Sequence, residues 1–176
     1  MKSLLITMLF GFSAMAAEVD LKKSSFNWKG TKVSGEHVGT IDLKSANLKM
    51  DDGKIKSGEF VIDINSVDVT DLEGKWKKKL EDHLKSDDFF SADKYPTAKL
   101  KINKADDQHV YGDLTIRDKS HSVKIPYTKS GKTYSGTLTF DRTKFDMKYN
   151  SGNFFKNLGD KMIHDEVNVG FKIVLK

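Results

Sequence analysis

Hydrophobic and polar residues alternate along most of this chain, which is the pattern of strands that bury one face. Phe60, Ile62 and Ile64 share one face of such a segment, and Asp63 and Asn65 point to the other. The same period recurs as far as the C-terminus, in segments separated by turns that contain Gly, Asn or Asp. The pattern therefore predicts eight or nine antiparallel strands, joined mostly by short turns.

One segment departs from this alternation and predicts a single amphipathic helix over about residues 72–85. An apolar residue recurs there every four positions, with Lys and Glu between, at Leu72, Trp76, Leu80 and Leu84. Asp71 is expected to cap the start of this helix. Successive strands with one helix indicate an all-β protein, either a closed barrel or a sandwich of two sheets. We favour the barrel because it leaves no exposed sheet edge.

The first residues have the layout of a secretory signal peptide. A short basic start precedes the apolar stretch Leu4–Phe12, and Ala14 and Ala16 supply small residues before a cleavage site. We therefore predict a signal peptide over residues 1–16, cleaved after about Ala16, and one domain over residues 17–176. Export of a chain without cysteine fits a bacterial periplasm, where disulfides are permitted but not required.

Composition narrows the possible partners. The 176 residues carry a formal charge of +5, but Arg117 and Arg142 are the only arginines, the residue best suited to bidentate phosphate and base contacts. Lysines alternate with apolar residues, as at Lys99 and Lys101, which places them on the solvent face of a strand. No nucleic-acid partner is predicted. The absence of cysteine excludes thiol nucleophiles, disulfides and thiolate metal sites.

No motif indicates catalysis, a metal site or a cofactor. The 5 histidines include no pair at the spacing of metal ligands, and the Gly-x-Ser-x-Gly motif of serine hydrolases is absent. One loop stands out: residues 150–162 are rich in Gly and Asn and contain Phe154 and Phe155. Two adjacent Phe residues in such a loop must be buried, cover another group or bind something.

Four short motifs in one order are similar to those of a known family. They are His83–Phe90 (HLKSDDFF), Lys94–Thr97 (KYPT), Gly112–Ile116 (GDLTI) and Asp141-Arg142. With them the chain resembles the YceI-like lipid-binding family over essentially all of residues 17–176. The resemblance implies an eight-stranded antiparallel lipocalin-like barrel that is periplasmic or secreted and holds a long isoprenoid or related amphiphile. It implies no catalytic residues.

The resulting hypothesis is a periplasmic carrier for an amphiphilic lipid: a polyisoprenoid, an isoprenoid quinone or a fatty-acid derivative. An apolar tail gains about 0.8 kcal/mol for each CH2 removed from water, so a dry barrel interior favours it. His83 and Arg142 are the candidates for contact with the lipid headgroup. The candidates for the apolar lining, including the lid and mouth, are Trp28, Phe60, Ile62, Ile64, Leu84, Phe89, Phe90, Leu114, Ile116, Phe140, Phe145, Phe154 and Phe155.

Two other functions fit the same pattern. A lipid-modifying enzyme would need a polar cluster inside the barrel, such as His83 with Asp82 or Arg142. A ligand-free interaction module would use its aromatic loops to contact the membrane or a membrane protein. Transient contact of this kind is also compatible with a carrier. Eight strands make a barrel that is either filled by its side chains or able to hold one ligand, so strand number does not separate these functions.

Overall fold

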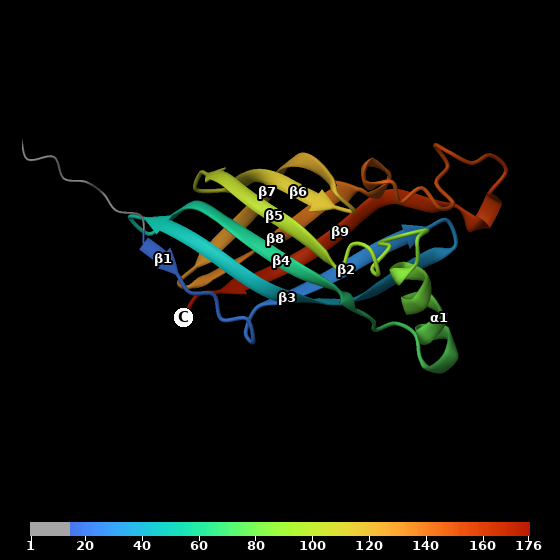
Figure 1. Ribbon diagram of the computed structural model, residues 1–176, viewed down its shortest axis with the longest axis horizontal. Coiled ribbons are helices and arrows are strands. Elements are labelled where there is room, and N and C mark those ends of the chain that lie inside the picture. Colours follow the sequence, from blue (N-terminus) through green and yellow to red (C-terminus); the bar gives the residue numbers. More distant parts are fainter. Residues whose placement is uncertain (1–14) are drawn as a thin grey trace, which may run out of the picture.

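Nine antiparallel strands wrap around one axis as an elongated barrel, and a helix lies at one end of it (Figure 1). The computed structural model describes residues 15–176. The strands are β1 (Met15–Ala17), β2 (Ser25–Lys32), β3 (Gly35–Asp51), β4 (Lys54–Val69), β5 (Thr97–Ala105), β6 (His109–Ile116), β7 (Lys119–Ser130), β8 (Thr133–Asp141) and β9 (Ile163–Val174). The helix is α1 (Gly74–Lys85), and two 3-10 turns are η1 (Arg142–Phe145) and η2 (Gly159–Lys161).

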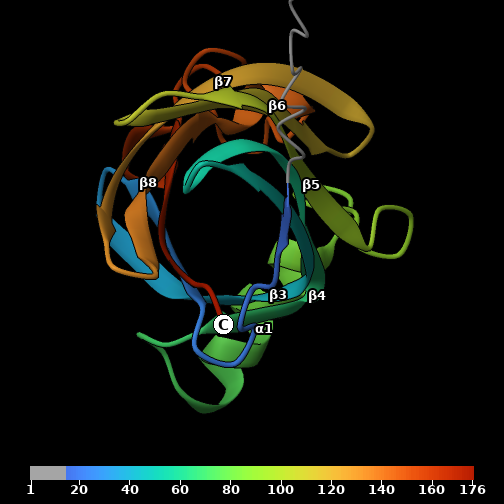
Figure 2. The ribbon, with the colours of Figure 1, turned by 90° about the vertical axis from the view of Figure 1, so that its left-hand side faces the viewer.

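Strands β2 to β9 close into a ring because the first of them pairs with the last. Phe26 of β2 lies opposite Phe171 of β9, and the long strands β3 and β4 pair along most of their length. Figure 2 looks along the axis and shows the strands as a ring. The predicted eight-stranded antiparallel barrel is confirmed, and the alternative of a two-sheet sandwich is wrong.

The short strand β1 pairs with β3 beside the ring, where Met15 lies opposite Met50. Met15 and Ala16 belong to the predicted signal peptide, and the rest of that segment, residues 1–14, lies outside the described residues. The signal peptide and its cleavage after about Ala16 therefore stay a prediction.

The alternation of the sequence becomes an inside and an outside of the barrel. Every second residue of β6 is buried, namely Val110, Gly112, Leu114 and Ile116. Buried side chains form two clusters along the axis, one toward α1 and one toward the opposite end. Among the described helices, none is long and apolar enough to cross a bilayer.

Gly39 of β3 allows the side chain of Trp28, on the neighbouring strand β2, to lie against the backbone of β3. A Cβ atom at this position would lie 1.9 Å from the carbonyl oxygen of Asp68 and 2.6 Å from the ring of Trp28. The missing side chain lets the indole lie against β3, where its Nε1–H donates to the carbonyl of Thr40 over 3.2 Å. This contact fixes the orientation of Trp28.

The helix begins later than predicted, at Gly74, and Asp71 does not cap it. The N-cap residue is Glu73, whose side chain makes no capping bond. Asp71 instead binds His37 Nδ1 over 2.8 Å and accepts the N–H of Val38 over 3.1 Å. The predicted cap is wrong because both carboxylate oxygens of Asp71 bind groups of β3.

Arg142 ties the end of β8 to the start of β9. Its side chain is 2% exposed. Its Nε–H donates to the carbonyl of His164, its Nη1–H to that of Met147, and its Nη2 to the carbonyl of Ile163 and the carboxylate of Asp165. Burial lowers the pKa of Arg142, and the charge of Asp165 opposes that shift. The guanidinium is thus a structural bridge at this end of the barrel.

We expect Arg142→Ala to lower the free energy of unfolding by about 3–5 kcal/mol, because it leaves the carbonyls of Met147, Ile163 and His164 without this donor and removes the cation beside Asp165. The control is Lys78→Ala, which removes an exposed ion pair with Asp82 of 2.7 Å and should cost less than about 1 kcal/mol. Urea unfolding of both variants measures the difference. Equal, small losses would contradict a structural role for Arg142.

Candidate functional site: an apolar cavity inside the barrel

The barrel encloses a cavity of about 250 Å³. All eight strands of the ring contribute to its wall, together with α1 and the turn that follows it. At one end the wall includes Ile55 and Tyr134, next to the β3–β4 and β7–β8 turns. At the other it includes Leu80 and Leu84 of α1. The cavity therefore extends along most of the barrel, and its lining is almost wholly apolar.

Most of the predicted lining residues lie in this wall. On the strands their alternation directs them inward, as expected. The predicted residues that the structure places in the wall are Trp28, Phe60, Ile62, Ile64, Leu84, Phe89, Phe90, Leu114, Ile116 and Phe140. Their contact with a ligand stays a prediction.

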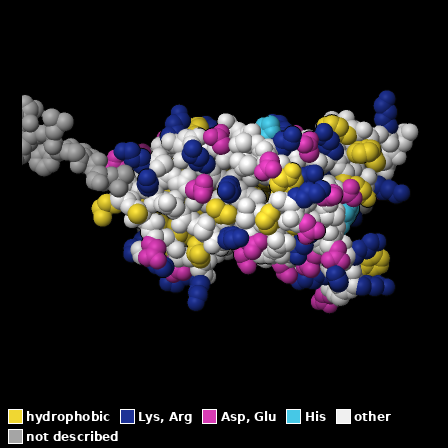
Figure 3. Space-filling model, in the orientation of Figure 1, with side chains coloured by type: hydrophobic (Ala, Val, Ile, Leu, Met, Phe, Trp, Pro, Cys, Tyr) yellow, Lys and Arg dark blue, Asp and Glu magenta, His cyan; other side chains and the backbone are white. Residues whose placement is uncertain are grey.

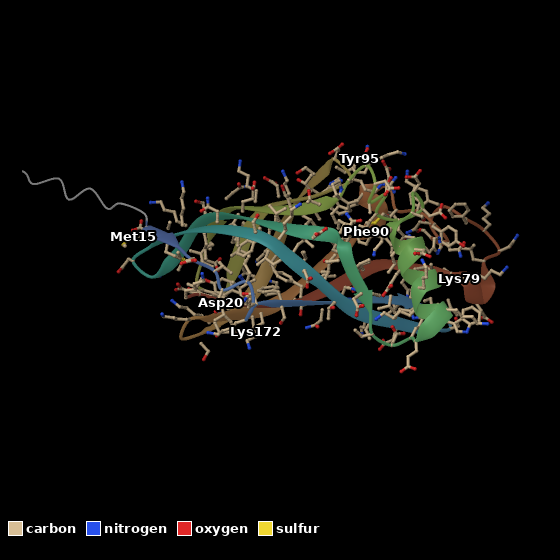
Figure 4. The ribbon with its side chains drawn as sticks, turned by 60° about the horizontal axis from the view of Figure 1, so that its bottom comes forward. Met15, Asp20, Lys79, Phe90, Tyr95 and Lys172 are labelled. Carbon is tan, nitrogen blue, oxygen red and sulfur yellow. The ribbon has the colours of Figure 1, made fainter. Side chains whose placement is uncertain are left out.

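Phe89 and Phe90 both reach the cavity although they are adjacent in sequence. The backbone N–H of Phe90 donates to the carbonyl of Leu84 over 3.0 Å, and that of Phe89 donates to Ser86 over 3.1 Å. These bonds form a tight turn after α1, so the two side chains do not alternate as they would on a strand. Figure 4 shows Phe90 beside the helix, at the end of the barrel opposite Met15.

Three predicted lining residues lie elsewhere. Phe145 is 1% exposed and packs edge-on against Phe140 and His121, so it belongs to the core behind the wall. Phe154 and Phe155 lie off the cavity, with 52% and 49% of their surface exposed. Hydrogen bonds at the base of their loop hold them outward, and their contact with a ligand at the mouth stays a prediction.

The predicted headgroup residues have other partners. His83 lies outside the cavity wall, where its Nε2 is 3.1 Å from a carboxylate oxygen of Asp88. Its ring meets Phe89 and Tyr149 edge-on, at centroid distances of 5.0 and 4.6 Å, and supports Phe89 from behind. Arg142 does reach the wall, but its hydrogen bonds go to the backbone and to an aspartate.

The cluster that an enzymatic function would need is not assembled from the residues proposed for it. His83 pairs with Asp88, Asp82 pairs with Lys78, and Arg142 is bound as described above. In the part of the chain that the structure describes, no group of three or more His, Asp or Glu side chains could hold a metal ion.

Polar wall residues missed from the sequence gather toward α1. The hydroxyl of Thr31 is 2.8 Å from Nδ1 of His164, and Lys32 and His37 also reach the cavity. Burial raises the pKa of Asp71, but hydrogen bonds from His37 and from Val38 N–H outweigh it and leave that pKa below its ordinary value. Alternation could have found two of these residues, because Lys32 is in phase with Trp28 and His37 with Ile41.

The opposite end of the cavity is occupied by tyrosine rings. Tyr134 is 4% exposed, and Tyr127 lies beside it at a centroid distance of 5.7 Å. The hydroxyl of Tyr127 donates to the carbonyl of Asp106 over 2.7 Å, and burial raises its pKa. The two ends of the cavity therefore differ: tyrosine rings lie at one, and a few polar side chains lie among apolar ones at the other.

Comparisons with known proteins agree with this architecture. BcnA of Burkholderia cenocepacia is 27% identical, with a TM-score of 0.71 over 90% of this chain and 100% of BcnA. A polyisoprenoid-binding domain from Saccharophagus degradans is 13% identical, with a TM-score of 0.64 over 93% of this chain and 99% of that domain. A YceI protein of Campylobacter jejuni is 19% identical, with a TM-score of 0.52 over 100% of this chain and 99% of its own.

A comparison with curated protein sequences finds no match. The model of the YceI-like domain, by contrast, matches residues 18–175. That range includes all eight strands of the ring, the helix and the connections between them. The chain therefore belongs to the YceI-like domain family.

Proposed function

We propose that the protein is a carrier that holds the apolar tail of an amphiphilic lipid inside its barrel. The observation that carries the proposal is the apolar cavity that extends along most of the barrel. Membership of the YceI-like family supports it, as does the fold shared with a polyisoprenoid-binding domain. The proposed cargo is a polyisoprenoid, an isoprenoid quinone or a fatty-acid derivative, and the proposed role is binding rather than catalysis.

The volume of the cavity limits how much of a lipid tail it can hold. A cavity of about 150 Å³ holds benzene, so the 250 Å³ of this barrel accommodate only a short part of a polyprenyl chain. A longer tail requires wall side chains to move, and we expect the half-buried Phe90 and Leu138 to be among those that do. Each CH2 buried contributes about 0.8 kcal/mol toward that rearrangement.

The different ends of the cavity suggest an orientation for the lipid. Thr31, Lys32, His37 and His164 offer hydrogen bonds and positive charge toward α1. We place the headgroup there and the tail toward Tyr134. These residues replace His83 and Arg142 as our headgroup candidates, because the hydrogen bonds of those two side chains go to other groups.

We also propose that the protein works in the periplasm. This proposal is supported by the signal-peptide pattern of residues 1–16 and by the absence of cysteine from the domain that follows. A carrier in that compartment receives its lipid from a membrane, so transient contact with a membrane belongs to the proposal. N-terminal sequencing of the exported protein tests it, and a first residue near Ala17 is the expected result.

Filling the cavity should abolish binding without unfolding the barrel. Ala98 of β5 is a small wall residue beside Ile62, and we expect Ala98→Phe to occupy the space that the tail needs. Retention of an added isoprenoid quinone through gel filtration measures the effect, with circular dichroism as the test of folding. Thr137→Phe, which adds the same ring to an exposed position of β8, is the control. Full retention by folded Ala98→Phe would mean that the tail binds elsewhere.

A polar side chain at the turn after α1 should weaken binding. We expect Phe90→Ser to reduce quinone affinity about tenfold or more, since burial of an aromatic side chain contributes about 1.5–3 kcal/mol. Tyr95→Ser is the control, because Tyr95 follows in the same connection and lies outside the cavity wall. Fluorescence titration of the two variants compares them. If both bound quinone like the unaltered protein, Phe90 would not contact the tail.

A further inference from the structure

The end of the barrel that carries α1 presents aromatic side chains to solvent from two separate segments. Trp76 of α1 is 59% exposed, and Phe154 and Phe155, in the loop before β9, are 52% and 49% exposed. At the end where α1 and this loop lie, Figure 3 shows separate groups of hydrophobic side chains with Lys or Arg, and also Asp or Glu, beside them. Exposed aromatic groups at one end of a molecule indicate a surface that binds a membrane or another protein.

The loop is held in this position by hydrogen bonds. Ser151 is fully buried, and its hydroxyl donates to the carboxylate of Asp165 over 2.9 Å. The amide of Asn153 donates to the same carboxylate over 2.7 Å. The backbone N–H groups of Phe154 and Phe155 both donate to the carbonyl of Ser151. The two Phe rings are therefore directed into solvent by an anchored turn.

Helix α1 leaves part of its apolar stripe uncovered in a similar way. Leu80 and Leu84 are half-buried and line the cavity, whereas Trp76, one turn earlier, is exposed. The helix is attached to β4 by Glu81, which accepts the N–H of Val69 over 3.0 Å. One apolar stripe therefore runs from the cavity to the outer surface.

Lysines surround the exposed aromatic rings. The ammonium groups of Lys75 and Lys79 lie 5.5 and 5.7 Å from the centre of the Trp76 ring, and that of Lys148 lies 5.0 Å from Phe154. Among the ion pairs of residues 15–176, none engages Lys75 or Lys79. Lys148 is paired with Asp146 over 3.2 Å, so the unpaired cations are those beside Trp76. An aromatic ring beside unpaired cations matches the interface of an anionic bilayer, where rings lie among the headgroups and cations face negative charge.

We propose that this end of the barrel docks on an anionic membrane through an aromatic–lysine face, defined as Trp76, Phe154 and Phe155 with Lys75 and Lys79. The proposal rests on the proposed carrier function for its purpose and names the source of the lipid. Because the stripe of α1 continues from this face to the cavity, a tail can pass from the bilayer into the barrel along an apolar path. It thereby avoids the cost of about 0.8 kcal/mol for each CH2 exposed to water.

Vesicle flotation of the exported protein tests the docking directly. The probes are vesicles of phosphatidylcholine alone and vesicles that also contain phosphatidylglycerol. We expect binding to the anionic vesicles, weakened by salt because the exposed charges are screened. Trp76→Ala should reduce the partition coefficient about fivefold or more. Lys75→Gln with Lys79→Gln should reduce it about fivefold per lysine. Phe154→Ala with Phe155→Ala provides a second, independent aromatic variant.

A charge-matched control separates the face from general attraction. Lys44→Gln with Lys49→Gln removes two exposed lysines from β3, on the barrel wall, and should leave flotation nearly unchanged. If this control lost as much binding as Lys75→Gln with Lys79→Gln, the proposed face would be wrong. The membrane proposal would also be wrong if the unaltered protein failed to float with phosphatidylglycerol vesicles at low salt. Binding of a protein by the same surface would not rescue it.

A second measurement separates membrane docking from the carrier function: retention of a quinone that is added from detergent, without vesicles. Variants of the aromatic–lysine face should keep their cargo while they lose vesicle binding, because these side chains lie off the cavity wall. A protein that floats with anionic vesicles but retains no quinone would contradict the carrier function and leave the docking intact. Loss of cargo and vesicle binding together in folded Trp76→Ala would contradict a separate docking surface.

Discussion

The pairing of β2 with β9 is the interaction on which the rest of the structure depends. It joins the first strand of the ring to the last and converts a sheet with two faces into a wall with an inside and an outside. Alternation then directs every second side chain toward one axis. An eight-stranded ring is just wide enough for its side chains to fill or for one ligand to occupy. Here the inward residues leave a cavity of about 250 Å³, so closure of the ring creates the apolar space on which the proposed function depends.

A second constraint acts at the α1 end, where Asp165 is bound from two directions. Arg142 reaches it from the end of β8, and Ser151 and Asn153 reach it from the loop before β9. One half-buried carboxylate therefore holds both the end of the cavity wall and the base of the loop that displays Phe154. The cavity wall and the proposed membrane surface therefore share this support.

Much of the fold, and part of the cavity wall, could be predicted from the sequence. Alternation placed Phe60 and Leu114 inward because the period of a strand is also the period of a barrel wall. It could not place Phe154, since exposure of a loop residue depends on how the loop is anchored. Nor could it assign Arg142, whose partner Asp165 lies on a different strand. Lys32 has the inward phase of Trp28 but is charged, and alternation alone assigns apolar residues to the inner face. An unfilled interior leaves no periodic signal in the sequence.

If the cavity holds a lipid tail in the living cell, protein purified from those cells should carry that lipid. Mass spectrometry of organic extracts tests it most directly, on protein purified from its native cells beside a sample that has been stripped by heat and repurified. We expect a stoichiometric lipid with an isoprenoid or fatty tail in the first sample and its loss from the second. Native protein that carries no lipid, and that also refuses added quinone and fatty amides, would contradict it.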